Sequence, residues 1–193
     1  CARRSVWETA CTIEEVDGGK AGYTYGKAVY EVKVVISDAG AGKLKIEKTI
    51  TKKLGGTDTP ATEIAFADAY KTSGNLVLTA KKSLTGATMS KDEFTFTLTG
   101  NGQNQSKKNA LDGTVTFDKI SYSQSDIGKS YIYTIAEADG GKDGYTYDKA
   151  TYEVKVDISD AGAGKLKIEK TITKKLEGTD TPATEITFAN AYK

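Results

Sequence analysis

Three polar residues occupy positions where the surrounding pattern calls for apolar side chains. Lys82 alternates with Leu78 and Ala80, and Glu137 and Asn190 stand in phase with the apolar and aromatic residues of two later runs. Burial lowers the pKa of an amine and raises the pKa of a carboxyl. A neutral Lys82 is a nucleophile, and a protonated Glu137 would bond the Asn190 carboxamide, polarise its carbonyl and relay protons. Attack on that amide carbon releases ammonia and leaves a Lys–Asn isopeptide bond without any cofactor.

The same pattern has a plainer interpretation. Lys170 stands equally in phase with Ile168 and Ile172. Long polar side chains near strand ends often lay their stems on apolar surface and keep their charged tips in water. Alternation alone therefore leaves two interpretations open, a reactive triad and a set of solvated rim residues.

The runs that carry these residues predict an all-β fold. Apolar and polar residues alternate in short stretches bounded by Gly, Asp, Asn and Ser, most regularly over 152–158. A run over 76–84 predicts one strand that includes Lys82. Eight or more such runs within 72–193 predict a β-sandwich or barrel. The stretch 162–165 lacks the full spacing of a phosphate-binding loop and predicts a hairpin turn.

A tandem repeat organises the chain. Residues 14–71 align without gaps with residues 136–193 at an offset of 122 (136 minus 14), and nine of the 58 aligned positions differ. We therefore expect a complete repeat over 72–193 that follows the C-terminal half of another repeat over 12–71. Near-identical tandem copies are typical of arrays in which each module is a spacer.

The half repeat departs from the complete one at the candidate chemistry. It keeps Glu15 at the position of Glu137, but Asp68 stands where the complete repeat has Asn190. A lysine strand that matches the one around Lys82 is missing. These residues predict an incomplete equivalent site, which is either unreacted or completed by a first-half repeat from another chain.

The first eleven residues, CARRSVWETAC, differ in composition from everything that follows. They hold Cys1, Cys11, Trp7 and the only arginines of the chain. One interpretation is a Cys-closed loop that presents Trp7 and the arginines to a partner. The other is an added segment or a locally divergent strand. Because exported chains meet oxidising conditions, we expect a disulfide between Cys1 and Cys11.

Composition excludes several classes of function. The chain has no histidine, which removes the commonest general base and metal ligand, so we expect no metal and no cofactor. A net charge of +1 favours neither nucleic acid nor an anionic membrane as a partner, and no apolar run is long enough to cross a bilayer. Neither a signal peptide nor a sorting tail is recognisable, so we expect an internal piece of a longer protein.

Several stretches of the complete repeat resemble a known family. They are AKKSLTG (80–86), EFTFTL (93–98), DGTVTF (112–117), DIGKSYIYTIAE (126–137), GYTYDKATYEVKV (144–156) and FANAY (188–192). In this order they resemble the pilin isopeptide linkage domain of streptococcal-type major backbone pilins. The resemblance implies an immunoglobulin-like β-sandwich of the CnaB or pilin type. It also implies a cross-link between Lys82 and Asn190 with Glu137 as the assisting acid.

The resemblance further implies a structural protein and not a multiple-turnover enzyme. Such a repeat is a stalk module of a pilus or fibrillar adhesin, extracellular and anchored to the cell wall of a Gram-positive bacterium. Its partners are neighbouring repeats or pilin subunits. Two other functions stay open: an adhesin piece that binds a host surface ligand through the Cys1–Cys11 loop, and an engineered split-ligation protein that captures a first-half repeat.

Overall fold

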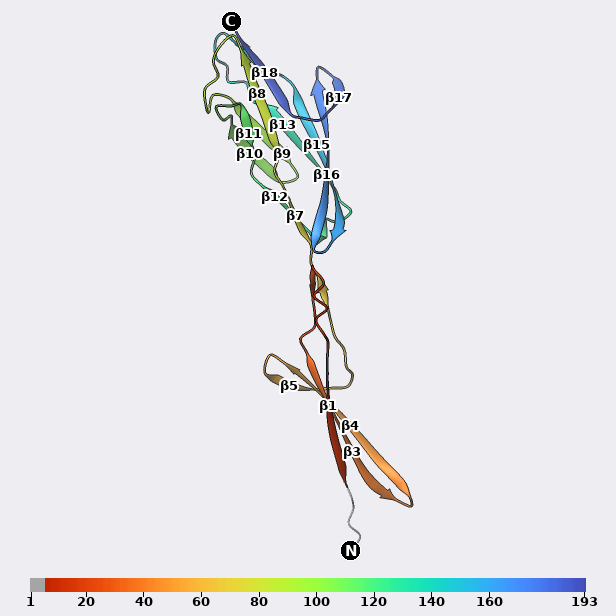
Figure 1. Ribbon diagram of the computed structural model, residues 1–193. Coiled ribbons are helices and arrows are strands. Elements are labelled where there is room, and N and C mark those ends of the chain that lie inside the picture. The colour runs from red at the N-terminus through yellow and green to blue at the C-terminus, as the bar shows by residue number, and fades with distance from the viewer. Residues whose placement is uncertain (1–5) are drawn as a thin grey trace. The chain divides into compact units, whose positions relative to one another are not determined.

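The computed structural model describes residues 6–193, which form strands β1 to β18 and one short 3-10 helix, η1 (Gln124–Asp126) (Figure 1). The chain divides after Lys71 into two compact units, residues 1–71 and 72–193. We call them unit 1 and unit 2 and describe each by itself.

Unit 2 consists of two main sheets. Its strands are β7 (Ser73–Leu76), β8 (Thr79–Thr85), β9 (Thr95–Gly100), β10 (Gln103–Lys108), β11 (Thr114–Thr116), β12 (Ile120–Ser123), β13 (Ser130–Glu137), β14 (Tyr145–Thr146), β15 (Thr151–Gly162), β16 (Lys165–Leu176), β17 (Thr179–Ala183) and β18 (Thr187–Tyr192). The larger sheet has the order β10-β9-β13-β15-β16-β7-β12, with β17 paired to β16, and the smaller has the order β11-β8-β18-β14. Neighbouring strands are antiparallel except β8 with β18 and the short contact of β7 with β16.

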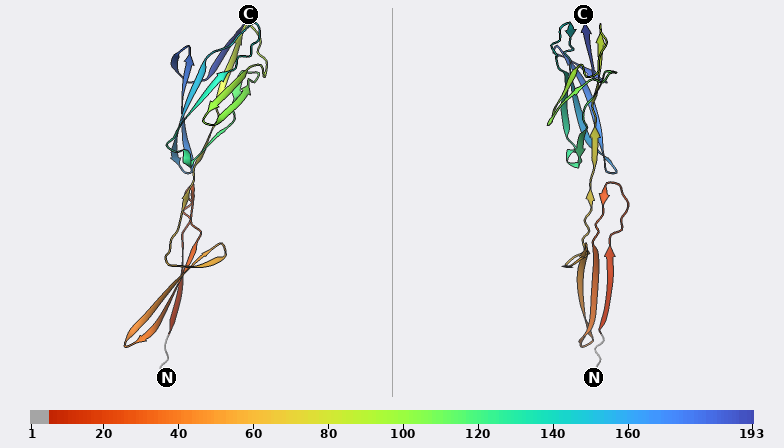
Figure 2. Two further views of the ribbon diagram at one scale, coloured as in Figure 1. Left: turned by 180° about the vertical axis from the view of Figure 1, so that it is seen from behind. Right: turned by 90° about the vertical axis from the view of Figure 1, so that its left-hand side faces the viewer.

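The apolar faces of the two sheets pack against each other. Phe188 of the smaller sheet lies between two rings of the larger one, with ring centroids 5.3 Å from Phe96 and 5.2 Å from Tyr152. These residues belong to one cluster of buried side chains that fills the space between the sheets. The expected all-β sandwich is confirmed, and Figure 2 shows its strands from two further sides.

The strand expected over 76–84 is two strands in two sheets. Leu76 ends β7 opposite Ile120 in the larger sheet, whereas Thr79 begins β8 opposite Thr116 in the smaller one. The chain changes sheets at the residues between them, and Leu78 stays buried. Side-chain alternation continues through this change, which explains why the pattern did not reveal it.

The predicted hairpin turn is confirmed. Strand β15 ends at Gly162 and β16 begins at Lys165. Three successive residues, 162–164, have φ values of 78°, 53° and 73°, which suit the tight return of the chain. The Asp160 carboxylate accepts a hydrogen bond from the Gly162 N–H at 2.8 Å.

Unit 1 contains a sheet of order β1-β3-β4-β5 and a short pair, β2 with β6. The strands are β1 (Trp7–Glu14), β2 (Tyr23–Thr24), β3 (Val29–Gly40), β4 (Lys43–Leu54), β5 (Thr57–Ala61) and β6 (Ala69–Tyr70). Strand β1 pairs with β3 along its whole length and crosses the boundary expected between residues 11 and 12. Residues 7–11 are therefore part of a strand, which agrees with the divergent-strand interpretation and not with a free loop.

Identical sequence has different surroundings in the two units. Leu44 and Ile46 are 69% and 65% exposed in unit 1, whereas the matching Leu166 and Ile168 pack against the core of unit 2. Strand β7 makes the difference, because Gly74 lies so close that a Cβ there would meet the Ile168 side chain at 2.9 Å. The first half of a repeat is thus what turns the second half into a closed sandwich.

Candidate functional site

The candidate residues come from three strands on the inner faces of both sheets. Lys82 lies on β8, and Asn190 lies on the neighbouring parallel strand β18, opposite Leu84. Residues two apart on a strand share a face, so the Lys82 and Asn190 side chains lie side by side. Glu137 ends β13 in the facing sheet. The structure therefore brings together the three residues that the sequence singled out.

The Glu137 carboxyl group bridges the Lys82 amine and the Asn190 amide. The Lys82 Nζ lies 2.7 Å from Glu137 Oε2, and the Asn190 Nδ2 donates to Glu137 Oε1 at 2.8 Å. The side chains of Lys82 and Glu137 have no exposed surface. Amine, acid and amide are thus in hydrogen-bonding contact in a space that water does not reach.

Burial of the Lys82 and Glu137 side chains sets their protonation states. Burial lowers the pKa of Lys82, and hydrogen bonding and the charge of Glu137 oppose this shift only in part. Burial likewise raises the pKa of Glu137 against the opposing influence of Lys82. The Lys82 Nζ also lies 4.8 Å from the centre of the Phe94 ring, whose face attracts the protonated amine but replaces only a small part of a shell of water. Both shifts favour the neutral pair, an amine beside a carboxylic acid.

The orientation of the amide corrects one part of the predicted chemistry. We expected Glu137 to polarise the Asn190 carbonyl, but this is wrong, because the Asn190 Oδ1 accepts from the backbone N–H of Asp148 at 2.8 Å. A backbone N–H can only donate, so the carbonyl oxygen faces Asp148 and the amide nitrogen faces the carboxyl group. Glu137 therefore contacts the Asn190 amide nitrogen and the Lys82 amine nitrogen, one with each carboxyl oxygen.

Lys170, which fitted the pattern as well as Lys82, lies elsewhere. It belongs to β16 and is exposed to solvent. The solvated interpretation thus holds for Lys170 and fails for Lys82, which is 4% exposed.

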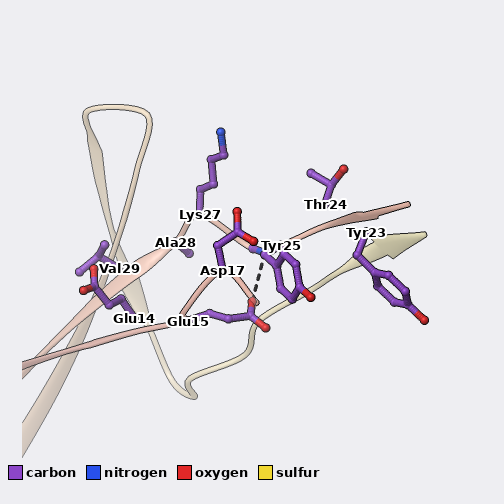
Figure 3. Close-up of a pocket in the computed structure, with 10 residues that line it drawn as sticks. Glu14, Glu15, Asp17, Tyr23, Thr24, Tyr25, Lys27, Ala28 and Val29 are labelled. Carbon is purple, nitrogen blue, oxygen red and sulfur yellow. Dashed lines mark hydrogen bonds between the residues drawn. The ribbon is translucent and has the colours of Figure 1, made fainter. Parts of the chain in front are cut away.

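The incomplete site of unit 1 keeps two of its three parts. The backbone N–H of Gly26 donates to Glu15 Oε2 at 3.1 Å and to Asp68 Oδ1 at 3.2 Å. Figure 3 shows Glu15 at a pocket of about 330 Å³ that also takes in Tyr25, and its dashed line marks the bond to Glu15. Within the described residues 6–193, no ion pair joins Glu15 or Asp68 to a lysine.

The expected disulfide lies partly outside the described residues, because Cys1 belongs to residues 1–5. Cys11 is exposed on β1, where its Sγ lies 3.8 Å from the Val32 carbonyl oxygen. The pairing of Cys1 with Cys11 stays a prediction.

Residues 6–193 contain no cluster of three or more His, Cys, Asp or Glu side chains suited to a metal ion. They also contain no helix with the length and apolar character needed to cross a membrane.

Comparison with known families agrees with this geometry. The model of a family described as FctA, a Spy0128-like isopeptide containing domain, matches residues 8–71 and 78–193. The chain belongs to the FctA family. No curated protein matches the chain. The FctA match confirms the resemblance to Gram-positive pilin isopeptide domains and assigns the chain to a pilin-type structural domain, a kind found in surface-exposed pili.

Within this FctA chain, sequence reasoning missed the contact that Asp148 makes through its backbone. A backbone N–H carries no residue-type signature, so no motif pointed to it. The one available signal was that position 148 is among the nine that differ between the repeats, where Gly26 stands in the half repeat.

Replacement of Glu137 tests its role as a relay. We expect Glu137→Gln to fold and to keep its neighbours in place but to stay uncross-linked, because an amide cannot pass a proton between the two nitrogens. We expect Glu137→Ala to be uncross-linked as well and less stable by about 1–3 kcal/mol, because the buried Lys82 amine loses its hydrogen-bond partner. Intact mass and denaturant unfolding measure the two effects.

The control for this prediction is Glu185→Gln, which removes an exposed acid of the same unit. It should cross-link like the unaltered chain. Cross-linking of Glu137→Gln at the unaltered rate would show that Glu137 is a bystander.

Proposed function

We propose that the complete repeat of this FctA chain is a rigid stalk module, locked by an isopeptide bond that forms between Lys82 and Asn190 without an enzyme. The observation that carries the proposal is the buried chain of contacts from amine to carboxyl to amide, at 2.7 and 2.8 Å. The family match supports it, because that family is described by its isopeptide. We place the module on the Gram-positive cell surface, with neighbouring pilin subunits as its partners.

The reaction balances with the residues of the site alone. The Lys82 Nζ attacks the Asn190 Cγ and gives one proton to Glu137. Glu137 passes a proton to the Asn190 Nδ2, which leaves as ammonia when the C–N bond breaks. One C–N bond replaces another, the carboxyl group ends as it began, and each site reacts once.

The bond predicts a lower mass. We expect the purified chain to be lighter than its sequence by one ammonia, and the difference should persist after boiling with reductant. Lys82→Ala and Asn190→Ala should each restore the full mass, because each removes one reacting atom. Intact mass spectrometry measures this, with Lys81→Ala as the matched control from the exposed face of β8. A well-folded unaltered chain of full sequence mass would refute the proposal.

The position of the bond explains why it would stiffen a stalk. Lys82 and Asn190 lie on adjacent parallel strands, so pulling on the two ends of unit 2 loads β8 against β18 in shear. The bond joins residues that are 108 positions apart (190 minus 82), and force that passes through it bypasses the chain between them. By analogy with a disulfide that closes a loop of this length, the constraint on the unfolded chain stabilises unit 2 by about 4–5 kcal/mol.

Single-molecule pulling tests the mechanical role. In the unaltered chain only β7 and the start of β8 precede the bond, so we expect unit 2 to extend by no more than about 30 Å. Asn190→Ala should release the enclosed residues and extend by roughly 350 Å at ordinary unfolding forces. Equal extensions would remove the mechanical role even if the bond itself is present.

A second candidate function rests on the incomplete site. Glu15 and Asp68 are held together by the Gly26 N–H, as an acid and an acceptor for an amine. In unit 2 the corresponding groups receive Lys82 from the first half of the repeat. We propose that unit 1 accepts a first-half repeat segment and forms a Lys–Asp isopeptide bond with loss of water.

Covalent capture tests this second function. We expect a separate polypeptide that spans residues 72–128 to form an adduct with the full chain, lighter than the sum of the two by one water. Asp68→Ala in the acceptor and Lys82→Ala in the added segment should each abolish the adduct. If unit 2 of the full chain is cross-linked but no adduct forms, the capture function is refuted and the proposed Lys82–Asn190 bond is not.

A further inference from the structure

The loop that leads into β15 places a hydrogen-bond donor at the atom where negative charge would develop. When an amine attacks the Asn190 amide, the carbonyl oxygen Oδ1 becomes an oxyanion. The backbone N–H of Asp148 already lies 2.8 Å from this oxygen. A donor at this distance, away from water, is the arrangement that stabilises the tetrahedral intermediates of acyl transfer.

The Asp148 side chain fastens this loop at two points. Its Oδ2 accepts from the backbone N–H of Ala189 at 2.9 Å, and its Oδ1 accepts from the backbone N–H of Ala150 at 2.9 Å. Ala189 is the residue directly before Asn190 on β18. One carboxylate therefore ties the donor loop to the strand that carries the reacting amide.

Unit 1 shows the same site without this carboxylate. Gly26 stands at the position of Asp148, and its N–H is shared between Glu15 at 3.1 Å and Asp68 at 3.2 Å. A Cβ at Gly26 would lie 3.3 Å from the backbone of Ala67, so the two segments approach each other as they do in unit 2. Both units have the backbone N–H donor. Only in unit 2 does a side chain, that of Asp148, fix the loop, and there the N–H donates to Asn190 alone.

We propose that Asp148 is a positioning residue of the cross-linking reaction: its carboxylate locks the loop to β18 so that its own backbone N–H stabilises the oxyanion on Asn190. The inference rests on the proposed Lys82–Asn190 bond. It assigns the carbonyl side of the amide to Asp148 and leaves Glu137 to move protons on the nitrogen side.

The rate of bond formation tests the inference. Pulse-labelled chain from cell-free translation is followed by denaturing gel, in which the cross-linked form migrates differently. We expect Asp148→Gly, which copies unit 1, to slow cross-linking about ten- to a hundredfold. Asp148→Asn keeps one acceptor oxygen, which can face Ala189 or Ala150 but not both, so it should recover part of that loss. Asp143→Ala removes an exposed charge from the segment before β14, also copies unit 1, and should react at the unaltered rate.

A pH series separates positioning from charge. Burial lowers the pKa of Lys82, and the negative charge of Asp148 opposes this shift. If charge were the whole effect, Asp148→Asn and Asp148→Gly would behave alike and move the pH–rate profile toward lower pH. A positioning role instead lowers the rate of Asp148→Gly at every pH and separates it from Asp148→Asn.

Amide hydrogen exchange provides a second test that does not require the Asp148→Gly variant to fold. In Lys82→Met, which cannot cross-link, the amide of residue 148 should exchange at least about tenfold more slowly than that of exposed Asp143. Equal exchange, or equal cross-linking rates for Asp148→Gly and Asp143→Ala, would overturn the inference while the bond stands. An unaltered chain that never cross-links would overturn the inference and the proposed function together.

Discussion

The protonation states of the candidate site in unit 2 depend on one constraint, the burial of Lys82, Glu137 and Asn190 away from water. In water the amine would hold its proton and the amide would be inert. Between the two sheets the charged forms cost several kcal/mol each, so a neutral amine beside a carboxylic acid becomes the favoured pair. The buried aromatic side chains near the site, Phe94 and Phe96 among them, therefore do more than fill the core, because they also keep water from the site. Burial between the two sheets thus lowers the pKa of Lys82 and raises the pKa of Glu137.

Much of this arrangement could be predicted from the order of residues, and the rest could not for identifiable reasons. Regular alternation with aromatic residues placed Lys82 and Asn190 on inner faces, and a closing FANAY stretch marked the last strand. Alternation could not separate Lys82 from Lys170, because burial depends on what covers a strand and not on its own pattern. It also could not show that β7 and β8 belong to different sheets, since the inward phase persists through the change.

The two units together show how environment outweighs local sequence. The strands 43–54 and 165–176 have the same residues, yet unit 1 leaves exposed what unit 2 covers with β7. Two of the nine differences between the copies, Gly26 for Asp148 and Asp68 for Asn190, are hydrogen-bonded to each other in both units. The copies have thus diverged at the donor and the acceptor of a single contact, where a change in one alters what the other can do.

The parallel pairing of β8 with β18 has a consequence for survival outside the cell. With the proposed bond between Lys82 and Asn190, the backbone would contain a closed ring, and both ends of the unit would leave from that ring. A protease that cuts one exposed turn, such as 140–144, would open the ring without separating the two ends. The two ends of the unit would stay connected after any number of cuts within the ring, and only a cut outside it, before Lys82 or after Asn190, would part them.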